Sequence, residues 1–121
     1  MSEHSKKLFE AVFRTDYDKI NKLINEGADI NAVNYHGFGL LHKAAFRNYK
    51  EVIGFLLDRE ADINAVGGHD KCTALHIAVQ NCCVESLNLL LKRGADINAK
   101  VGEGNDKGCT ALHLAAFDNN Y

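Results

Sequence analysis

The sequence predicts an all-α solenoid of about three and a half helix–turn–helix repeats. One short motif, (G/E)ADINA, occurs at 27–32, 60–65 and 94–99, so its copies are 33 and 34 residues apart. A second motif follows each copy, and amphipathic segments lie between the two motifs. A period near 33 residues indicates one supersecondary unit repeated along the chain and not a single globular core.

The second motif begins the first helix of each unit. It reads GLLHKA at 39–44, TALHIA at 73–78 and TALHLA at 110–115, at spacings of 34 and 37 residues. The last connecting loop, which includes the glycine-rich stretch 102–108, is therefore a few residues longer than the others. A short apolar face from Leu41 to Ala45 ends at Arg47 and Asn48, which predicts a first helix of about two turns.

The second helix of each unit carries a longer apolar stripe. From Lys50 onward, apolar residues fall on one helical face at Val52, Ile53, Leu56 and Leu57. The same stripe recurs in the units before and after, at Ile20, Leu23 and Ile24 and at Leu87, Leu90 and Leu91. Gly27 and Gly94 follow these helices, where a left-handed C-terminal cap favours glycine. Glu60 takes that place in the middle unit, so we expect a small loss of local stability there.

The first unit has the composition of an N-terminal cap. It lacks the Leu-His motif, and its first helix offers one apolar side formed by Leu8, Phe9, Ala11 and Val12. The outer side of this unit carries charges at Lys6, Lys7, Glu10, Lys19 and Lys22. The predicted units are thus a capping repeat at 1–33, repeats at 34–66 and 67–100, and an incomplete C-terminal repeat at 101–121.

Both motifs resemble those of the ankyrin-repeat family over nearly the whole chain, from about Lys6 to Tyr121. The family's T-P-L-H-x-A signature is matched at 73–78 and 110–115 and more loosely at 39–44, and its G-A-D-V-N-A ending is matched with Ile for Val. The resemblance implies an ankyrin-repeat solenoid with β-hairpin-like loops. It also implies that the motif histidines bond backbone groups of the neighbouring loop and hold no metal, at His42, His76 and His113.

The sequence departs from the family pattern in two places. It has no proline, so Leu40, Ala74 and Ala111 stand at the first helical position, which should weaken each helix start slightly. The residues given end at Tyr121, after the inner helix of the last unit. We therefore expect either a fragment of a longer array or a homodimer through the uncapped C-terminal edge, formed by Leu112, Leu114 and Ala116.

Composition narrows the function and the compartment. Hydrophobic residues make up 46% of the chain and charged residues 25%, and the net charge of −2 comes without a basic run, which argues against a nucleic-acid partner. Apolar runs such as 89–91 are too short to cross a membrane, and the N-terminus does not read as a secretory signal. We expect a cytoplasmic or nuclear protein. Its four cysteines should be reduced, because Cys72 and Cys109 occupy equivalent places in stacked repeats, roughly 8–10 Å apart.

No catalytic, cofactor or metal site is predicted. His36 and His69 lie in connecting loops, where a single histidine is usually polar surface. The glycine-rich stretch 102–108 lacks the G-K-[ST] ending of a phosphate-binding loop. There is no C-x-x-C spacing for zinc or redox chemistry either. A free-standing enzyme is the function class that we expect least.

The resemblance places partner binding at the loop tips and on the exposed side of the inner helices. The inner-helix positions that map to that side are Phe13 and Arg14, Phe46 and Arg47, Gln80 and Asn81, and Phe117 and Asp118. The loop tips add Val33, Tyr35, His36, Phe38, Val66, His69 and Asp70. Aromatic residues and arginine are enriched at protein interfaces. This face would suit a partner segment with apolar anchors and some acidic character.

The sequence thus predicts a protein–protein interaction module that binds a partner through loop tips and the inner-helix face. Three alternatives stay open at this stage. The phenylalanines could pack against neighbouring repeats instead of a partner. The chain could be a regulatory or targeting segment of a larger enzyme or effector. It could also associate with itself through the C-terminal edge.

Overall fold

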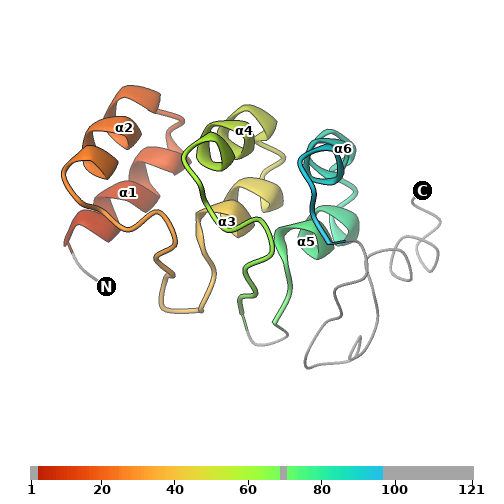
Figure 1. Cartoon of the computed structure of the whole chain (residues 1–121). Coiled ribbons are helices and arrows are strands. Elements are labelled where there is room, and N and C mark those ends of the chain that lie inside the picture. The colour runs from red at the N-terminus through yellow and green to blue at the C-terminus, as the bar shows by residue number, and fades with distance from the viewer. Residues whose placement is uncertain (1–2, 69–70, 97–121) are drawn as a thin grey trace.

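The computed structural model describes residues 3–68 and 71–96 of the chain, and the last predicted unit, 101–121, lies outside them. The helices of the described part are α1 (Glu3–Phe13), α2 (Tyr17–Asn25), α3 (Leu40–Phe46), α4 (Lys50–Asp58), α5 (Ala74–Gln80) and α6 (Val84–Lys92). Figure 1 shows α1, α3 and α5 in one row, α2, α4 and α6 in a second row, and the loops projecting beyond the first row. The predicted all-α solenoid is confirmed.

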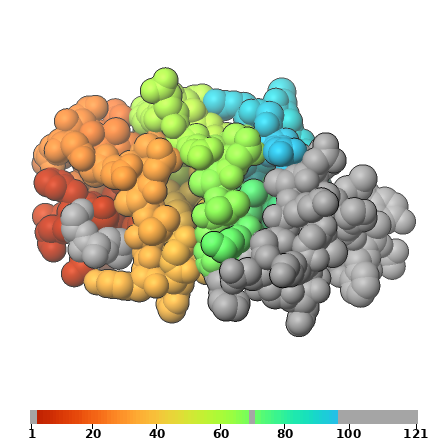
Figure 2. Space-filling view, turned by 60° about the horizontal axis from the view of Figure 1, so that its bottom comes forward, coloured from red at the N-terminus to blue at the C-terminus, as the bar shows by residue number. Residues whose placement is uncertain are grey.

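The repeats form layers that pack on their neighbours. Helix α1 packs on α2 and α3, α3 packs on α4 and α5, and α6 packs on α4 and α5. The core lies between the two rows of helices, and its largest fully buried aliphatic side chains include Leu8, Ile20, Leu40, Ile53, Leu56, Leu75 and Leu90. Figure 2 brings the loop side forward and shows the units as adjacent slabs in chain order. The apolar faces of the first two units are therefore each buried by the next repeat.

We call α1, α3 and α5 the inner helices and α2, α4 and α6 the outer helices. As predicted, α3 and α5 begin at the second motif. Thr73 caps α5: its Oγ1 accepts a hydrogen bond from the His76 backbone N–H (3.3 Å), and its own N–H donates to His76 Nδ1 (3.2 Å). Gly39 stands at the same place before α3 and has no hydroxyl to offer, so only the second bond forms, to His42 Nδ1 (3.1 Å). The start of α3 is therefore less completely capped than the start of α5.

Left-handed residues end both rows of helices. Gly27 (φ 100°) and Gly94 (φ 96°) follow α2 and α6, and Glu60 (φ 68°) follows α4. The predicted caps are thus confirmed, including the strained glutamate. The turns after the inner helices also use left-handed residues, at Thr15, Asn48 and Cys82. The sequence analysis did not identify these positions because none of them is glycine.

The loops between units resemble short hairpins. Single antiparallel bridges join Val33 to Gly39 and Gly67 to Cys72, and the described residues contain no longer strand. Successive loops also contact each other, because the Gly68 N–H donates to the carbonyl oxygen of Gly37 (3.2 Å). A Cβ atom at Gly67 would lie 2.5 Å from that oxygen, so only glycine fits where the loops meet.

The ADINA motif joins neighbouring repeats at the other end of the loops. Asn31 Oδ1 accepts a hydrogen bond from the Asp62 N–H (3.0 Å), and Asn64 Oδ1 accepts one from the Asp96 N–H (2.9 Å). Within the first two motifs the aspartate side chain accepts a hydrogen bond from the asparagine N–H two residues later, as Asp29 does from Asn31 (2.9 Å). The bond between neighbouring motifs recurs at both described repeat boundaries, which explains why the motif returns in each unit.

Candidate functional site

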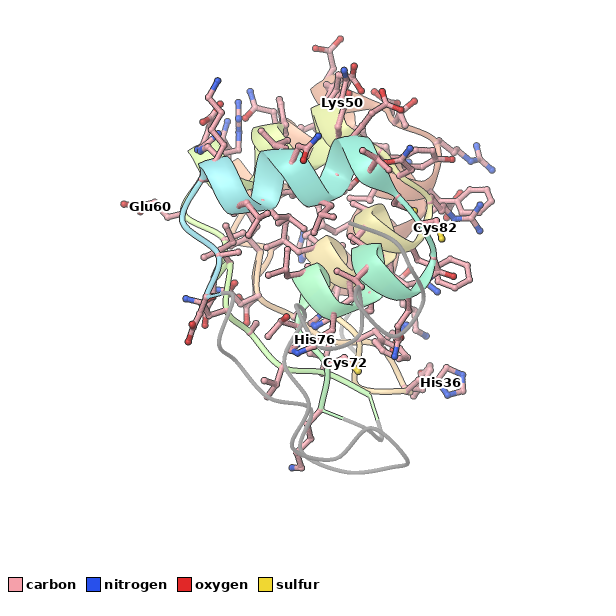
Figure 3. The ribbon with its side chains drawn as sticks, turned by 90° about the vertical axis from the view of Figure 1, so that its right-hand side faces the viewer. His36, Lys50, Glu60, Cys72, His76 and Cys82 are labelled. Atoms are coloured by element: carbon pink, nitrogen blue, oxygen red, sulfur yellow. The ribbon has the colours of Figure 1, made fainter. Side chains whose placement is uncertain are left out.

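The candidate site is the inner face, which we define as Phe13, Lys43, Phe46, Arg47, Gln80 and Asn81 on the inner helices together with His36 and Phe38 in the loop before α3. Figure 3, a view along the stack, shows His36 and Cys82 on one side of the repeat and Glu60 on the opposite side. Cys82 follows directly after Gln80 and Asn81, so the C-terminal ends of the inner helices share a side with the loop tip at His36.

The two phenylalanines of the described inner helices are exposed. Phe13 retains 54% of its accessible surface and Phe46 retains 60%. Arg14, Arg47, Gln80 and Asn81, which follow at the matching positions, are exposed as well. Neither ring is therefore buried between repeats, although Phe13 contacts Arg47 of the neighbouring unit. Phe117 and Asp118, the fourth pair, lie outside the described residues.

An arginine connects the first two units across this face. The Arg47 guanidinium lies over the Phe13 ring, 4.1 Å from its centroid, so it makes a cation–π contact between neighbouring repeats. Arg14 instead forms an ion pair with Glu10 one turn earlier on α1 (3.2 Å). The sequence analysis assigned Arg14 and Arg47 to the same binding side. They have different roles, because only Arg47 makes a contact across a repeat boundary.

A hollow of about 540 Å³ lies between α3 and α5 and beneath the loop before α3. Five residues predicted from the sequence line it together, namely His36, Phe38, Phe46, Gln80 and Asn81. Its floor includes the buried residues Cys72 and Ile77. Phe38 is half-buried, with its ring 5.8 Å from that of His42, so it forms a wall of the hollow and not an exposed tip.

A second hollow of about 270 Å³ lies between α1 and α3. Phe13 and Arg47 line it together with the half-buried aromatic rings of Phe9 and Tyr49. Lys43 lines both hollows, so it marks the boundary between them. The sequence analysis missed Lys43. The available signal was its spacing, since it lies three residues before Phe46 and so one turn earlier on the same side of α3.

Other predicted loop residues lie elsewhere. Val33 and Val66 are exposed but line a much smaller cavity of about 30 Å³ near the start of α3. Tyr35 is 77% exposed. Neither Tyr35 nor Arg14 lines either of the two hollows. His69 and Asp70 fall outside the described residues. The predicted surface is therefore broader than the inner face.

The inner face carries two cations without a paired anion. Within the described part of the chain, no carboxylate lies within 4.0 Å of the side-chain nitrogens of Lys43 or Arg47. Glu10 lines the second hollow, but its charge is paired with Arg14. The local charge is thus positive although the whole chain has a net charge of −2.

The histidine beneath the first hollow is structural. His42 Nε2 lies 2.8 Å from the carbonyl oxygen of Cys72, and its Nδ1 accepts from the Gly39 N–H, so the ring is neutral with its proton on Nε2. Burial lowers the pKa of His42 below its ordinary value and outweighs its bonds to backbone carbonyls. The predicted link from the motif histidine to the neighbouring loop is confirmed at His42. His113 lies outside the described residues.

The described residues offer few other reactive or metal-binding groups. Cys82 and Cys83 are free thiols, and burial, together with the neighbouring Cys82, raises the pKa of Cys83. No group of three or more His, Cys, Asp or Glu side chains in the described ranges could hold a metal ion. None of the described helices is both long and apolar enough to cross a bilayer.

A family model for ankyrin repeats, described as three copies, matches residues 8–101. A comparison with curated proteins found no match. Ankyrin repeats are generally protein–protein interaction modules, and their fold generally serves as a non-catalytic scaffold. The matched range includes all three copies of the first motif, the first two copies of the second motif and all described helices after α1, and it covers far more than half of the chain. The chain belongs to the ankyrin-repeat family.

Proposed function

We propose that this protein recognises a partner protein through its inner face. The observation that carries the proposal is that Phe13 and Phe46 are exposed at equivalent places on successive inner helices, with Arg47 bridging the units and a hollow beside each ring. Large aromatic residues and arginine are the side chains that most often dominate binding energy at protein interfaces. The inner face has both, next to hollows that can receive partner side chains.

The folded chain gains little from these two rings. Full burial of a phenylalanine side chain contributes about 1.5–3 kcal/mol, yet Phe13 and Phe46 leave more than half of their surface in water. A partner that covered them would gain the apolar burial that folding leaves unused. The two hollows are open to the surface between the inner helices, so the same partner could fill them without separating the repeats.

The net charge supports a protein partner, and the cysteines support a cytoplasmic or nuclear location. The net charge of −2 is unfavourable for nucleic acid, so we take the partner to be a protein. Cys82 is an exposed free thiol, which is ordinary in a reducing compartment and supports a cytoplasmic or nuclear location. The alternative of a homodimer through Leu112, Leu114 and Ala116 rests on residues outside the described part of the chain.

Affinity capture with matched variants tests the proposal. The wild-type chain, a Phe13→Ala/Phe46→Ala double variant and a Tyr17→Ala control would each be immobilised, and captured proteins quantified by mass spectrometry. Tyr17 is also an aromatic residue at the surface, 36% exposed, but it lies on the outer helix α2 against Phe55 and away from the inner face. We expect proteins that the wild type and Tyr17→Ala retain and the double variant loses. Equal capture by all three chains would contradict the proposal.

A further inference from the structure

We infer that the inner face binds a segment of its partner in which a carboxylate is flanked on both sides by large apolar side chains. This inference rests on the proposed function and specifies the chemistry of the partner. It follows from three features that the structure brings together, namely two adjacent hollows with apolar walls, a cation at their boundary, and a second cation at the edge of the smaller hollow.

The two hollows provide the apolar part of the inference. The larger one, about 540 Å³, has walls of Phe38 and Phe46 and the apolar side chain of Ile77 in its floor. The smaller one, about 270 Å³, is bounded by the rings of Phe9, Phe13 and Tyr49. Sites of a few hundred cubic ångströms with aromatic walls fit bulky apolar groups. Because the hollows belong to neighbouring repeats, one extended segment can place a side chain in each.

Lys43 provides the acidic part, because it lines both hollows at once. A segment that crosses from one hollow to the other must therefore pass this ammonium group. Arg47 adds a second positive charge beside the smaller hollow, and its contact with the Phe13 ring holds it in place. Neither cation has a carboxylate within 4.0 Å in the described residues. A partner carboxylate would supply the missing charge next to apolar surface, where the local dielectric constant is reduced.

The third unit restricts the expected preference for a partner carboxylate to the part of the inner face near Lys43. Gln80 and Asn81 stand where the first two units have phenylalanine and arginine, so the far wall of the larger hollow is polar and uncharged. Glu10 is the carboxylate among the residues that line the smaller hollow, and Arg14 pairs with it at 3.2 Å. The acid should therefore lie near Lys43 and not be spread along the segment.

A random-peptide display selection on the full chain tests the inference. Parallel selections would use the wild type, Phe46→Ala, Lys43→Glu/Arg47→Glu, and Lys22→Glu as a charge-changing control on the outer helix α2. Circular dichroism would establish that each chain is folded. For one enriched peptide, the affinity would be measured before and after its central Asp or Glu is replaced by Asn or Gln.

We expect wild-type and Lys22→Glu selections to enrich an acidic residue between large apolar ones, and the charge-reversed chain to enrich a basic residue there instead. Replacing the central acid should weaken binding to the wild type by about tenfold, the size expected for one partly desolvated charge pair. Peptides that require Phe46 but show no acidic preference would overturn this inference and leave the proposed function standing. Peptides indifferent to Phe46 would overturn both. A selection without enrichment would overturn the inference alone, because protein capture tests the function separately.

Discussion

The described part of the chain contains two phenylalanine–arginine pairs with similar ring contacts and different surroundings. On the outer helices, Arg59 lies over the Phe55 ring at 3.6 Å, and on the inner face Arg47 lies over the Phe13 ring at 4.1 Å. The outer pair is enclosed by other contacts: Arg59 donates to Asn21 Oδ1 (3.0 Å), and the Tyr17 ring lies 5.0 Å from that of Phe55. Phe55 is half-buried against the core, whereas Phe13 is 54% exposed.

This difference shows that residue type alone does not decide between a structural role and a binding role. The outer pair closes the boundary between α2 and α4, so most of its interaction energy is already used in the folded chain. The inner pair joins residues of two repeats, but the surface around it stays open and includes a hollow of about 270 Å³. We therefore assign the outer pair to the frame of the solenoid and the inner pair to recognition.

The largest expected effect is on the outer pair. Phe55→Ala should lower the free energy of unfolding by about 2–3 kcal/mol, because it removes a packed ring and leaves Arg59 and Tyr17 without their contact. Phe13→Ala should change it by no more than about 0.5 kcal/mol, as is usual for exposed positions. Urea unfolding followed by circular dichroism measures both. Equal destabilisation by the two substitutions would remove the distinction between the pairs.

A smaller effect is expected from the protonation of His42, which belongs to the frame. Its folded pKa lies below the ordinary value of 6.5, so the unfolded chain takes up more protons as the solution becomes acidic. Protonation would also place an N–H at Nδ1 against the Gly39 N–H. Stability should be fully present above pH 6.5 and fall below it, by up to about 1.4 kcal/mol per pH unit.

The predicted pH dependence can be measured both on the unfolding of the whole chain and on the His42 ring itself. Unfolding measured between pH 7.5 and 5.5 gives the global loss, and an NMR titration of the His42 ring gives its own pKa. The midpoint of the His42 titration should lie below pH 6.5. A His42 pKa at or above 6.5 would contradict the account of a neutral ring whose Nε2–H donates to the Cys72 carbonyl oxygen.

The smallest expected effect concerns the ends of the outer helices. Glu60→Gly should stabilise the chain by about 0.5–1 kcal/mol, because glycine adopts a left-handed backbone without the steric penalty of a Cβ atom. Gly27→Ala is the matched control: a Cβ there meets no atom within 4 Å, so its expected loss of about 1 kcal/mol comes from the backbone alone. Thermal unfolding measures both, and a destabilised Glu60→Gly chain would show that the Glu60 side chain makes a contribution of its own.

The frame could be predicted from the sequence because its determinants repeat. The motif spacing located the helix pairs, and of the apolar stripe predicted on α4, Val52, Ile53 and Leu56 are buried and Leu57 is partly buried. The stripe on α6 was less accurate, because Leu90 is buried but Leu91 is 38% exposed. The cap positions followed from Gly27 and Gly94 in the same way. Residues that recur once per unit reveal their role by their period, so the frame needs no knowledge of three-dimensional contacts.

The site could be predicted only in part, because it depends on contacts that occur once. The repeat map identified Phe13 and Phe46 as exposed, but it could not show that Arg47 lies over Phe13 and not beside its own neighbour. It missed Lys43, since no other unit has a cation at that position, where Glu10 and Ile77 stand in the first and third units. It also placed Phe38 at a loop tip, whereas close approach to Gly68 and His42 turns that ring inward.

The most direct test of the distinction between frame and face is a paired measurement of affinity and unfolding free energy for Phe46→Ala and Phe55→Leu. The probe is a peptide selected on the wild-type chain. Phe46→Ala should weaken peptide binding by at least about tenfold and leave the unfolding free energy within about 0.5 kcal/mol of wild type. Phe55→Leu should lower stability and leave affinity unchanged. Binding of the peptide to Phe46→Ala with wild-type affinity would contradict the assignment of the inner face to recognition.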